Sequence, residues 1–215
     1  MFGDEDSLIR FDMSEFQEKH SISRLIGSPP GYVGHEEGGQ LTEKVRRKPY
    51  SIVLFDEIEK ANKEIYNILL QLLDDGQLTD SLGRKVNFKN CMVIMTSNVG
   101  VRKLQEFGTG LGFNTKSKQS IEETIKEDTL LNELKKQFPP EFLNRLDDVI
   151  IFKTLTKEQI GKIVELEIDK LKERVVEIGY TLQINKTTKD YLVEQGYHKE
   201  YGARPLNRAI QKYVE

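Results

Sequence analysis

Ser51-Ile52-Val53-Leu54-Phe55-Asp56-Glu57 is an almost continuous apolar run that ends in two acids. A run of this kind is typical of a strand buried inside a parallel sheet. In open α/β sheets ligands bind beyond the carboxyl ends of the strands, which is where Asp56 and Glu57 follow the run. The pair therefore indicates a ligand site. The same pair could instead be an acidic strand end favoured by the dipole of a following helix.

Other short apolar runs lie on both sides of this strand, and helical patterns separate them. We expect strands at residues 8–11, 92–95 and 149–152, and an amphipathic helix over residues 62–73. The order strand, helix, strand implies crossover connections. The sequence therefore predicts an α/β fold with a mostly parallel sheet and helices on both sides.

The pattern changes near Lys153. Thr156 and Gln159 have the spacing of a capping box, which opens a long amphipathic helix, and two shorter helical stretches follow. We therefore expect a large α/β domain over residues 1–153 and a small, mainly helical domain over residues 154–215.

Composition narrows the class of partner. The 215 residues are 37% hydrophobic and 31% charged, and the net charge is −3. This near balance gives no global argument for a nucleic acid or an anionic membrane, so we expect neither as a partner. The basic run at residues 44–48 is either a solvated helix end or a binding patch.

The single cysteine, Cys91, cannot form an internal disulfide, and its apolar neighbours favour a buried thiol. The three histidines lie far apart without metal-ligand spacing. No apolar run approaches the length of a membrane span, and the N-terminus lacks a signal-peptide pattern. These features together lead us to expect a cytosolic protein.

Three more polar residues are candidates for a site. Asn98 follows the strand expected at residues 92–95, where its amide could bind a water or a phosphate oxygen, or cap the next segment. Arg145 could be functional or could pair with Asp147 or Asp148. Arg204 precedes a helix and could equally be a surface charge. Each of these signals is weak alone.

Two glycine-rich segments are expected to be exposed loops. Residues 27–34 read Gly-Ser-Pro-Pro-Gly-Tyr-Val-Gly, and residues 108–113 read Gly-Thr-Gly-Leu-Gly-Phe. The first places the aromatic ring of Tyr32 between glycines, which suits a broad, sequence-tolerant contact on a movable loop. Tyr32 could instead pack on its own loop.

The order of these features makes the set specific. It resembles the second ATPase module of the Clp/Hsp100 proteins over essentially the whole chain, most strongly at residues 27–34, 40–49 and 202–206. The resemblance implies an AAA+ fold of the P-loop NTPase type with a small C-terminal domain. It also implies ATP and Mg²⁺ as cofactors, and a homo-hexamer.

The same resemblance implies roles for the polar candidates. Asp56 and Glu57 match the Walker B acids, with Asp56 holding Mg²⁺ through the nucleotide. Asn98 matches sensor 1. Arg145 matches the arginine finger that reaches a neighbouring subunit's nucleotide, and Arg204 matches sensor 2, which contacts the phosphates from the small domain.

The loops match binding elements of the family. Tyr32, with Val33, matches the pore loop that grips unfolded polypeptide. Leu111, Gly112 and Phe113 resemble the hydrophobic loop by which the ClpC, ClpA and ClpX branches dock on the ClpP peptidase, although the segment could instead lie against its own domain. The disaggregase ClpB lacks such a loop.

These matches place the chain nearest the ClpC branch. The resemblance thus implies an ATP-dependent unfoldase that feeds polypeptides to ClpP in a bacterial cytoplasm or a plastid stroma. A ClpB-like disaggregase, or a non-hydrolysing fragment that keeps only binding surfaces, stays open as an alternative.

The phosphate-binding loop of the family is missing from the sequence. No Gly-x-x-x-x-Gly-Lys-[Ser/Thr] occurs in it, whereas the family carries this Walker A loop, and the strand that leads to it, upstream of the position of Met1. We therefore expect a chain that is cut at both ends, inactive alone, and left with a strand that lacks a neighbour.

Overall fold

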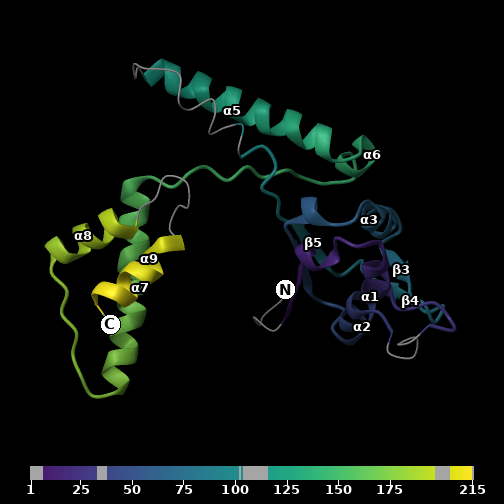
Figure 1. The fold of residues 1–215 in the computed structure, drawn as a ribbon, viewed down its shortest axis with the longest axis horizontal. Coiled ribbons are helices and arrows are strands. Elements are labelled where there is room, and N and C mark those ends of the chain that lie inside the picture. The colour runs from purple at the N-terminus through teal and green to yellow at the C-terminus, as the bar shows by residue number, and fades with distance from the viewer. Residues whose placement is uncertain (1–6, 33–37, 102, 104–115, 197–203, 215) are drawn as a thin grey trace. The chain divides into compact units, whose positions relative to one another are not determined.

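The structure, a computed structural model, describes residues 7–32, 38–101, 103, 116–196 and 204–214, with the backbone alone at residues 116–124 and 204. The chain divides into two compact units, Met1–Val149 and Ile150–Glu215. Figure 1 draws both units.

The first unit is built on a parallel sheet of three strands. β1 (Leu8–Asp12), β2 (Ile52–Asp56) and β5 (Met92–Met95) lie in the order β1-β2-β5, and the register aligns Phe11 with Phe55. These are three of the four strands expected from the sequence. The central position of β2 places its carboxyl end between its two neighbours.

The fourth expected strand is absent. Residues 149–152 form no strand in the described part of the chain, and Ile150 and Phe152 are 73% and 92% exposed. The segment runs from the end of the first unit into the second. An apolar run becomes a strand only where a neighbour satisfies its backbone hydrogen bonds, and no described strand pairs with this segment.

The two faces of the sheet differ in burial. Alternate residues of β1 and β2, such as Phe11 and Phe55, are buried in one core with side chains of the three helices α1 (Ile22–Ile26), α2 (Gln40–Arg47) and α3 (Lys63–Asp75). On the opposite face Leu8, Met92 and Ile94 are exposed. Burial on both faces, which the apolar runs predicted, is thus wrong for the described residues.

Helix α3 follows the expected helix at residues 62–73 closely. Its N-cap is Asn62, whose side chain accepts a hydrogen bond from the backbone N–H of Glu64 at 3.0 Å. Gly76 ends the helix with a φ of 62°, a left-handed conformation that glycine adopts without steric cost.

A small hairpin follows α3. β3 (Gln77–Thr79) and β4 (Lys85–Asn87) pair antiparallel, and Arg84 at the hairpin turn forms ion pairs with Asp80 and Glu43. The pair with Glu43 ties the hairpin to α2. The first unit also contains η2 (Met13–Phe16), η3 (Lys19–Ser21), η5 (Ile58–Lys60), α5 (Lys116–Gln137) and α6 (Pro140–Leu143).

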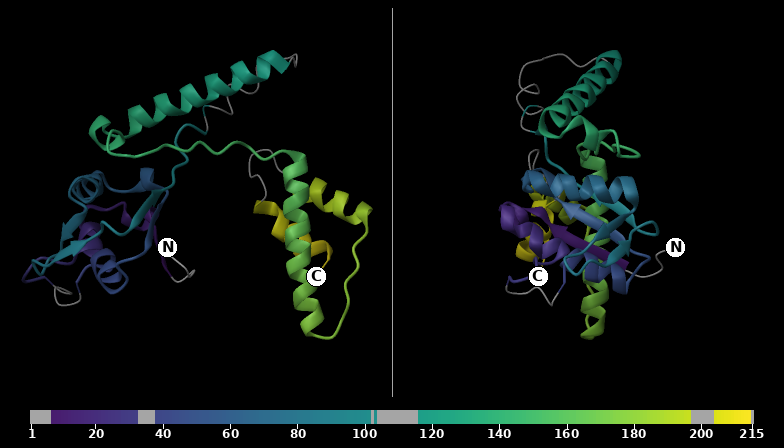
Figure 2. Two further views of the ribbon diagram at one scale, coloured as in Figure 1. Left: turned by 180° about the vertical axis from the view of Figure 1, so that it is seen from behind. Right: turned by 90° about the vertical axis from the view of Figure 1, so that its right-hand side faces the viewer.

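The second unit is helical. α8 (Lys186–Gly196) and α9 (Arg204–Tyr213) pack with α7 (Lys157–Glu177) around a separate apolar core (Figure 1 and Figure 2). The capping box predicted for Thr156 and Gln159 is present, and it starts α7 at the residue after Thr156. Among the described residues no helix combines the length and the hydrophobicity that a membrane span requires.

Candidate functional site

The acidic pair lies where β2 ends. Asp56 is the last residue of the strand, and Glu57 adopts φ 56° and ψ 51°. Glu57 is the single non-glycine residue with a positive φ in the described part of the chain. Left-handed backbone is unfavourable for such a residue and is found preferentially at functional sites, where surrounding contacts hold it.

Contacts from β5 hold this turn in place. The backbone N–H of Glu57 donates to Oγ1 of Thr96 at 3.0 Å, and the Thr96 hydroxyl donates to Oδ1 of Asp56. Thr96 is the residue that directly follows β5. Thr96 has no role in the motifs described above, although a hydroxyl at a strand end two positions before Asn98 is a signal that could have identified it.

Asn98 also reaches the acidic pair. Its side-chain Nδ2 donates to Oε1 of Glu57 at 3.3 Å, and its backbone N–H donates to Oε1 of Glu59 at 3.0 Å. The structure therefore brings together Asp56, Glu57 and Asn98 at the carboxyl ends of two adjacent parallel strands. A carboxylate and an amide in this arrangement can orient a water molecule between them.

Basic side chains flank the acids. Arg10, on β1, pairs with Asp56, and Lys60 pairs with Glu57. The hydrogen bond from Thr96, followed by that from Arg10, lowers the pKa of Asp56 below its ordinary value. The hydrogen bond to Glu57 raises the pKa of Lys60. Asp56 is therefore ionised, and Lys60 protonated, at neutral pH.

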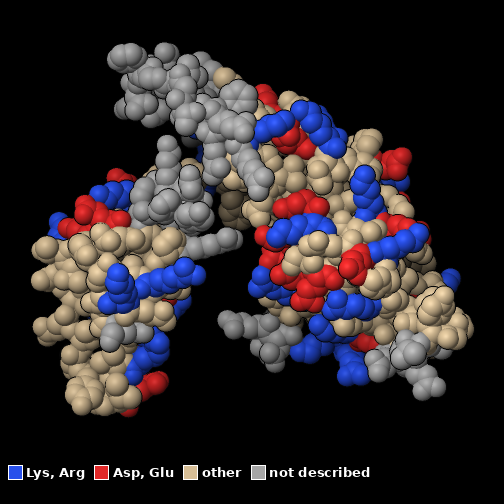
Figure 3. Space-filling view, in the orientation of Figure 1, with Lys and Arg blue, Asp and Glu red and all other residues tan. Residues whose placement is uncertain are grey.

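Opposite charges are mixed elsewhere on this unit as well. Figure 3 shows acidic and basic side chains interspersed over one of its faces. In the described part of the chain no group of three or more His, Cys, Asp or Glu side chains could hold a metal ion. A cation bound at Asp56 would therefore need ligands other than a cluster of described carboxylate, histidine or cysteine side chains.

Arg145 pairs with an acid other than Asp56 and Glu57. Its Nε forms an ion pair with Oδ1 of Asp74, on α3, at 2.6 Å, and its side chain is 57% exposed. Asp147 and Asp148, the partners considered from the sequence, are replaced in this pair by an acid 71 positions earlier in the chain. The structure thus keeps Arg145 on the surface of the first unit.

Tyr32 is presented on a tight turn. Its backbone N–H donates to the carbonyl oxygen of Pro29 at 3.2 Å, and Gly31 has a φ of 89°. Proline at the second position and a positive-φ glycine at the third are features of a type II turn. Tyr32 is 72% exposed, so it packs little against the part of its loop that the structure describes.

The remaining sequence candidates carry no structural information here. Val33, Leu111, Gly112 and Phe113 lie outside the described residues. Arg204 begins α9, but its side chain is not described.

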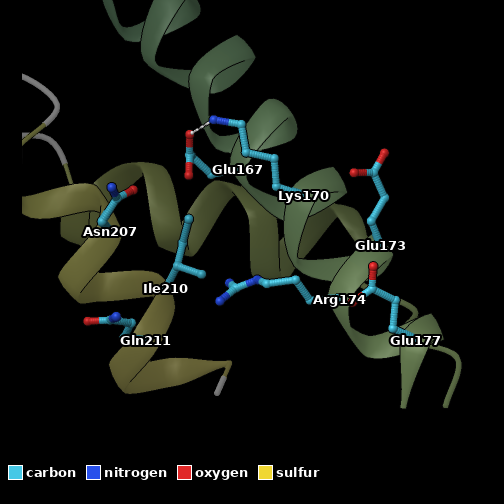
Figure 4. A pocket seen from close by; sticks show the side chains of 8 residues that line it. All are labelled: Glu167, Lys170, Glu173, Arg174, Glu177, Asn207, Ile210 and Gln211. Carbon is cyan, nitrogen blue, oxygen red and sulfur yellow. Dashed lines mark hydrogen bonds and ion pairs between the residues drawn. The ribbon is translucent and has the colours of Figure 1, made fainter. Parts of the chain in front are cut away.

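A hollow of about 490 Å³ lies in the second unit, between α7 and α9 (Figure 4). Its lining includes Glu167 and Lys170, which pair at 2.9 Å, and a single aliphatic side chain, Ile210. The other lining residues are Glu173, Arg174, Glu177, Asn207 and Gln211. Small-molecule sites have mostly apolar walls with a few converging polar groups, so this charged groove does not resemble one.

Comparison with known proteins places the chain in a family. A family model for the AAA domain (Cdc48 subfamily) matches residues 1–149. The chain belongs to the AAA domain family. A second family model, for the C-terminal, D2-small domain of ClpB protein, matches residues 155–215 of this AAA module.

Individual relatives are similar over the whole module. The ATP-dependent Clp protease ATP-binding subunit ClpC of Staphylococcus aureus (strain USA300) is 58% identical over 215 residues, which are 100% of this chain and 26% of the relative. ClpC of Staphylococcus epidermidis is 56% identical with the same coverage. The chain thus spans about a quarter of the length of these curated relatives.

A solved structure agrees. The chain resembles a closed-state cryo-EM structure of Hsp104 with ATPγS and FITC-casein, with a TM-score of 0.84 and 39% identity over 100% of this chain and 36% of that one. The predicted resemblance to the second ATPase module of the Clp/Hsp100 proteins is confirmed. The predicted AAA+ α/β fold with a helical C-terminal domain is confirmed as well.

Proposed function

We propose that this module hydrolyses ATP as part of an unfoldase that drives polypeptides into the ClpP peptidase. One observation carries the proposal: Asp56, Glu57 and Asn98 come together at the carboxyl ends of β2 and β5. Ligands of open α/β sheets bind at this edge, and phosphoryl transfer needs a metal-binding acid and a water-orienting group there.

The residues have separate tasks in this proposal. Asp56 would hold Mg²⁺, because a single ionised carboxylate beside phosphate oxygens suits this cation. Bound there, Mg²⁺ would supply positive charge against the phosphates. Glu57 orients the attacking water, and Asn98 keeps the Glu57 carboxylate in place through the 3.3 Å hydrogen bond. Arg204 contacts the phosphates from the small domain.

A phosphate-binding loop completes the site. The 215 residues contain no Gly-x-x-x-x-Gly-Lys-[Ser/Thr]. We propose that amides and a lysine of another segment of polypeptide cradle the phosphates. Within the described residues β5 pairs with β2 alone, and Met92 and Ile94 are exposed. This free edge and apolar face fit the strand that would lead to such a loop.

The two glycine-rich loops would bind the polypeptide substrate and the peptidase. Tyr32 and Val33 grip the substrate chain, and Leu111, Gly112 and Phe113 dock on ClpP. The 72% exposure of Tyr32 supports the first assignment, and the names of the ClpC relatives support a protease partner over a disaggregase. The Hsp104 structure with casein supports engagement of a protein substrate.

We propose an assembly and a setting for the module as well. The module works in a homo-hexamer, in which Arg145 reaches the nucleotide of the neighbouring subunit. A large subdomain over residues 1–153 and a small one over residues 154–215 form each copy. The bacterial ClpC relatives favour a cytoplasmic setting over a plastid stroma.

Substitution of Glu57 tests the proposal. In the intact protein, with the phosphate-binding loop in place, Glu57→Gln should keep ATP binding but lower turnover about 10² to 10⁴-fold, since the amide cannot orient and deprotonate water. Glu64→Gln is the matched control, because the side chain of Glu64 pairs with Lys19 on the surface and its backbone bond to Asn62 is kept in the variant. Normal turnover by Glu57→Gln would remove this residue from the mechanism.

A further inference from the structure

We infer that Thr96 is a positioning residue for hydrolysis, whose hydroxyl fixes both Walker B acids by bonding the side chain of Asp56 and the backbone of Glu57. The inference rests on the function proposed for the acids and adds a residue to it. Its basis is the set of contacts that Thr96, at the end of β5, makes with residues at the end of the neighbouring strand β2.

Thr96 contacts four consecutive residues. Its backbone N–H donates to the carbonyl oxygen of Phe55, and its carbonyl oxygen accepts from the N–H of Ile58, both at 3.0 Å. Any residue except proline could make these two backbone bonds. The side-chain hydroxyl adds the bonds to Asp56 and Glu57 between them. Only this second pair depends on the identity of residue 96.

The chemistry of the partners fixes the direction of each hydroxyl bond. An ionised carboxylate can only accept, so the proton of Thr96 points to Oδ1 of Asp56. A backbone N–H can only donate, so the N–H of Glu57 is directed at a lone pair of Oγ1 of Thr96. A hydroxyl does both at once, whereas a methyl group in its place does neither.

The bond to Glu57 acts on a strained position. Glu57 has a φ of 56°, and its N–H bond to Thr96, at 3.0 Å, is a direct restraint on that backbone. Asn98 restrains the carboxylate of Glu57 instead, at 3.3 Å. The two contacts are therefore complementary: Thr96 sets where the Glu57 side chain starts, and Asn98 sets where it ends.

Ser97 provides a matched comparison. Its Oγ accepts from the backbone N–H of Val99 at 3.2 Å, a bond within its own turn. Ser97→Ala removes a hydroxyl one residue away from Thr96 on the same segment. It should leave the acids where they are.

Steady-state ATPase kinetics of the intact protein test the inference. Thr96→Val, which replaces the hydroxyl by a methyl group of similar size, should lower kcat about tenfold to a hundredfold, because a bond to a charged group is lost. KM for ATP should change less than about twofold, since bound substrate is positioned by other groups. Thr96→Ser should restore most of kcat, and Ser97→Ala should resemble the parent protein.

The kcat values of these variants decide whether Thr96 positions the acids. Normal kcat in Thr96→Val, or an equal loss in Thr96→Val and Thr96→Ser, would overturn the inference. If Thr96→Val fails to fold, Thr96→Ala removes the same hydroxyl and is judged by the same results. Glu57→Gln, measured in parallel, distinguishes a failure of the proposed function from a failure of the role of Thr96. Turnover by Glu57→Gln would defeat the proposed function, whereas a block in Glu57→Gln with normal Thr96→Val would defeat only the role of Thr96.

Discussion

The carboxyl ends of β2 and β5 and the turn that carries Tyr32 are built in opposite ways. At the strand ends, Glu57 and Thr96 are 39 positions apart in the sequence and are joined by a hydrogen bond. At the turn, one backbone bond spans the four residues from Pro29 to Tyr32. The first arrangement exists only when the sheet has formed, whereas the second is local.

The difference matches the tasks proposed for the two regions. Hydrolysis requires groups held in one fixed geometry, which cross-strand bonds provide. Gripping polypeptides of many sequences requires an accessible aromatic surface, which the 72% exposure of Tyr32 provides. Substitutions at the strand ends should therefore change chemistry, and substitutions at the turn should change only the contact with substrate.

Substitution of Arg145 tests whether the site at the strand ends needs a residue from a neighbouring subunit. We expect it to have the largest effect on ATP hydrolysis. Arg145→Ala should lower ATP hydrolysis in assembled rings about 10³-fold or more while leaving ATP binding nearly intact, because a finger acts on transition-state charge in trans. Mixed rings provide the measurement: an inactive Arg145→Ala subunit should hydrolyse ATP when its neighbour supplies an intact arginine.

The ion pair with Asp74 offers a control for this prediction. Asp74→Asn removes the partner that holds Arg145 at 2.6 Å but keeps the guanidinium. We expect this variant to retain most activity. If it reproduces the loss, Arg145 acts through its own subunit's fold, and the strand ends need no neighbour.

Tyr32 tests the other half of the comparison. Tyr32→Ala should slow unfolding of a tagged substrate roughly threefold to tenfold, because an aromatic contact contributes about 0.5–1.5 kcal/mol. ATPase activity should stay within about twofold, and Tyr32→Phe should behave like the parent. Tyr50→Ala, at another exposed tyrosine, is the matched control. A parallel loss of both activities would mean that the turn supports the site, and the comparison would break.

Thr156, the N-cap of α7, is a local contact that lies in neither region. Its substitution should affect stability alone, and this is the smallest effect that we expect. Thr156→Ala should destabilise α7 by about 1 kcal/mol, because the hydroxyl that accepts from Gln159 at the helix start is lost. Urea denaturation followed by circular dichroism measures this change. Thr187→Ala, at an exposed position inside α8, should change stability by less than about 0.5 kcal/mol.

The sequence predicted the parts of the fold that local patterns determine. Three apolar runs became strands, and the capping box at Thr156 starts α7 as expected. Residues 149–152 did not become a strand, because strand formation depends on a neighbour that an apolar run cannot reveal. The β3–β4 hairpin was not predicted, since three-residue strands leave too short a pattern to detect.

The candidate site shows the same limit. Motif order identified Asp56, Glu57 and Asn98, and the structure places them together. The position of Thr96 at a strand end, two residues before Asn98, was a signal in the sequence, but its bond to Glu57 crosses 39 positions. The Arg145–Asp74 pair crosses 71 positions, and no spacing rule encodes it. The left-handed backbone of Glu57 was equally invisible, because glutamate has no preference for that conformation.

The most direct measurement is a structure of the intact protein with Mg²⁺ and a slowly hydrolysed ATP analogue. The account predicts that the terminal phosphate lies beyond the carboxyl ends of β2 and β5, with Asp56 on the side of the metal ion. Glu57 should face the position of the attacking water, with Thr96 still bonded to its backbone. A nucleotide bound by this module away from these strand ends would contradict the account.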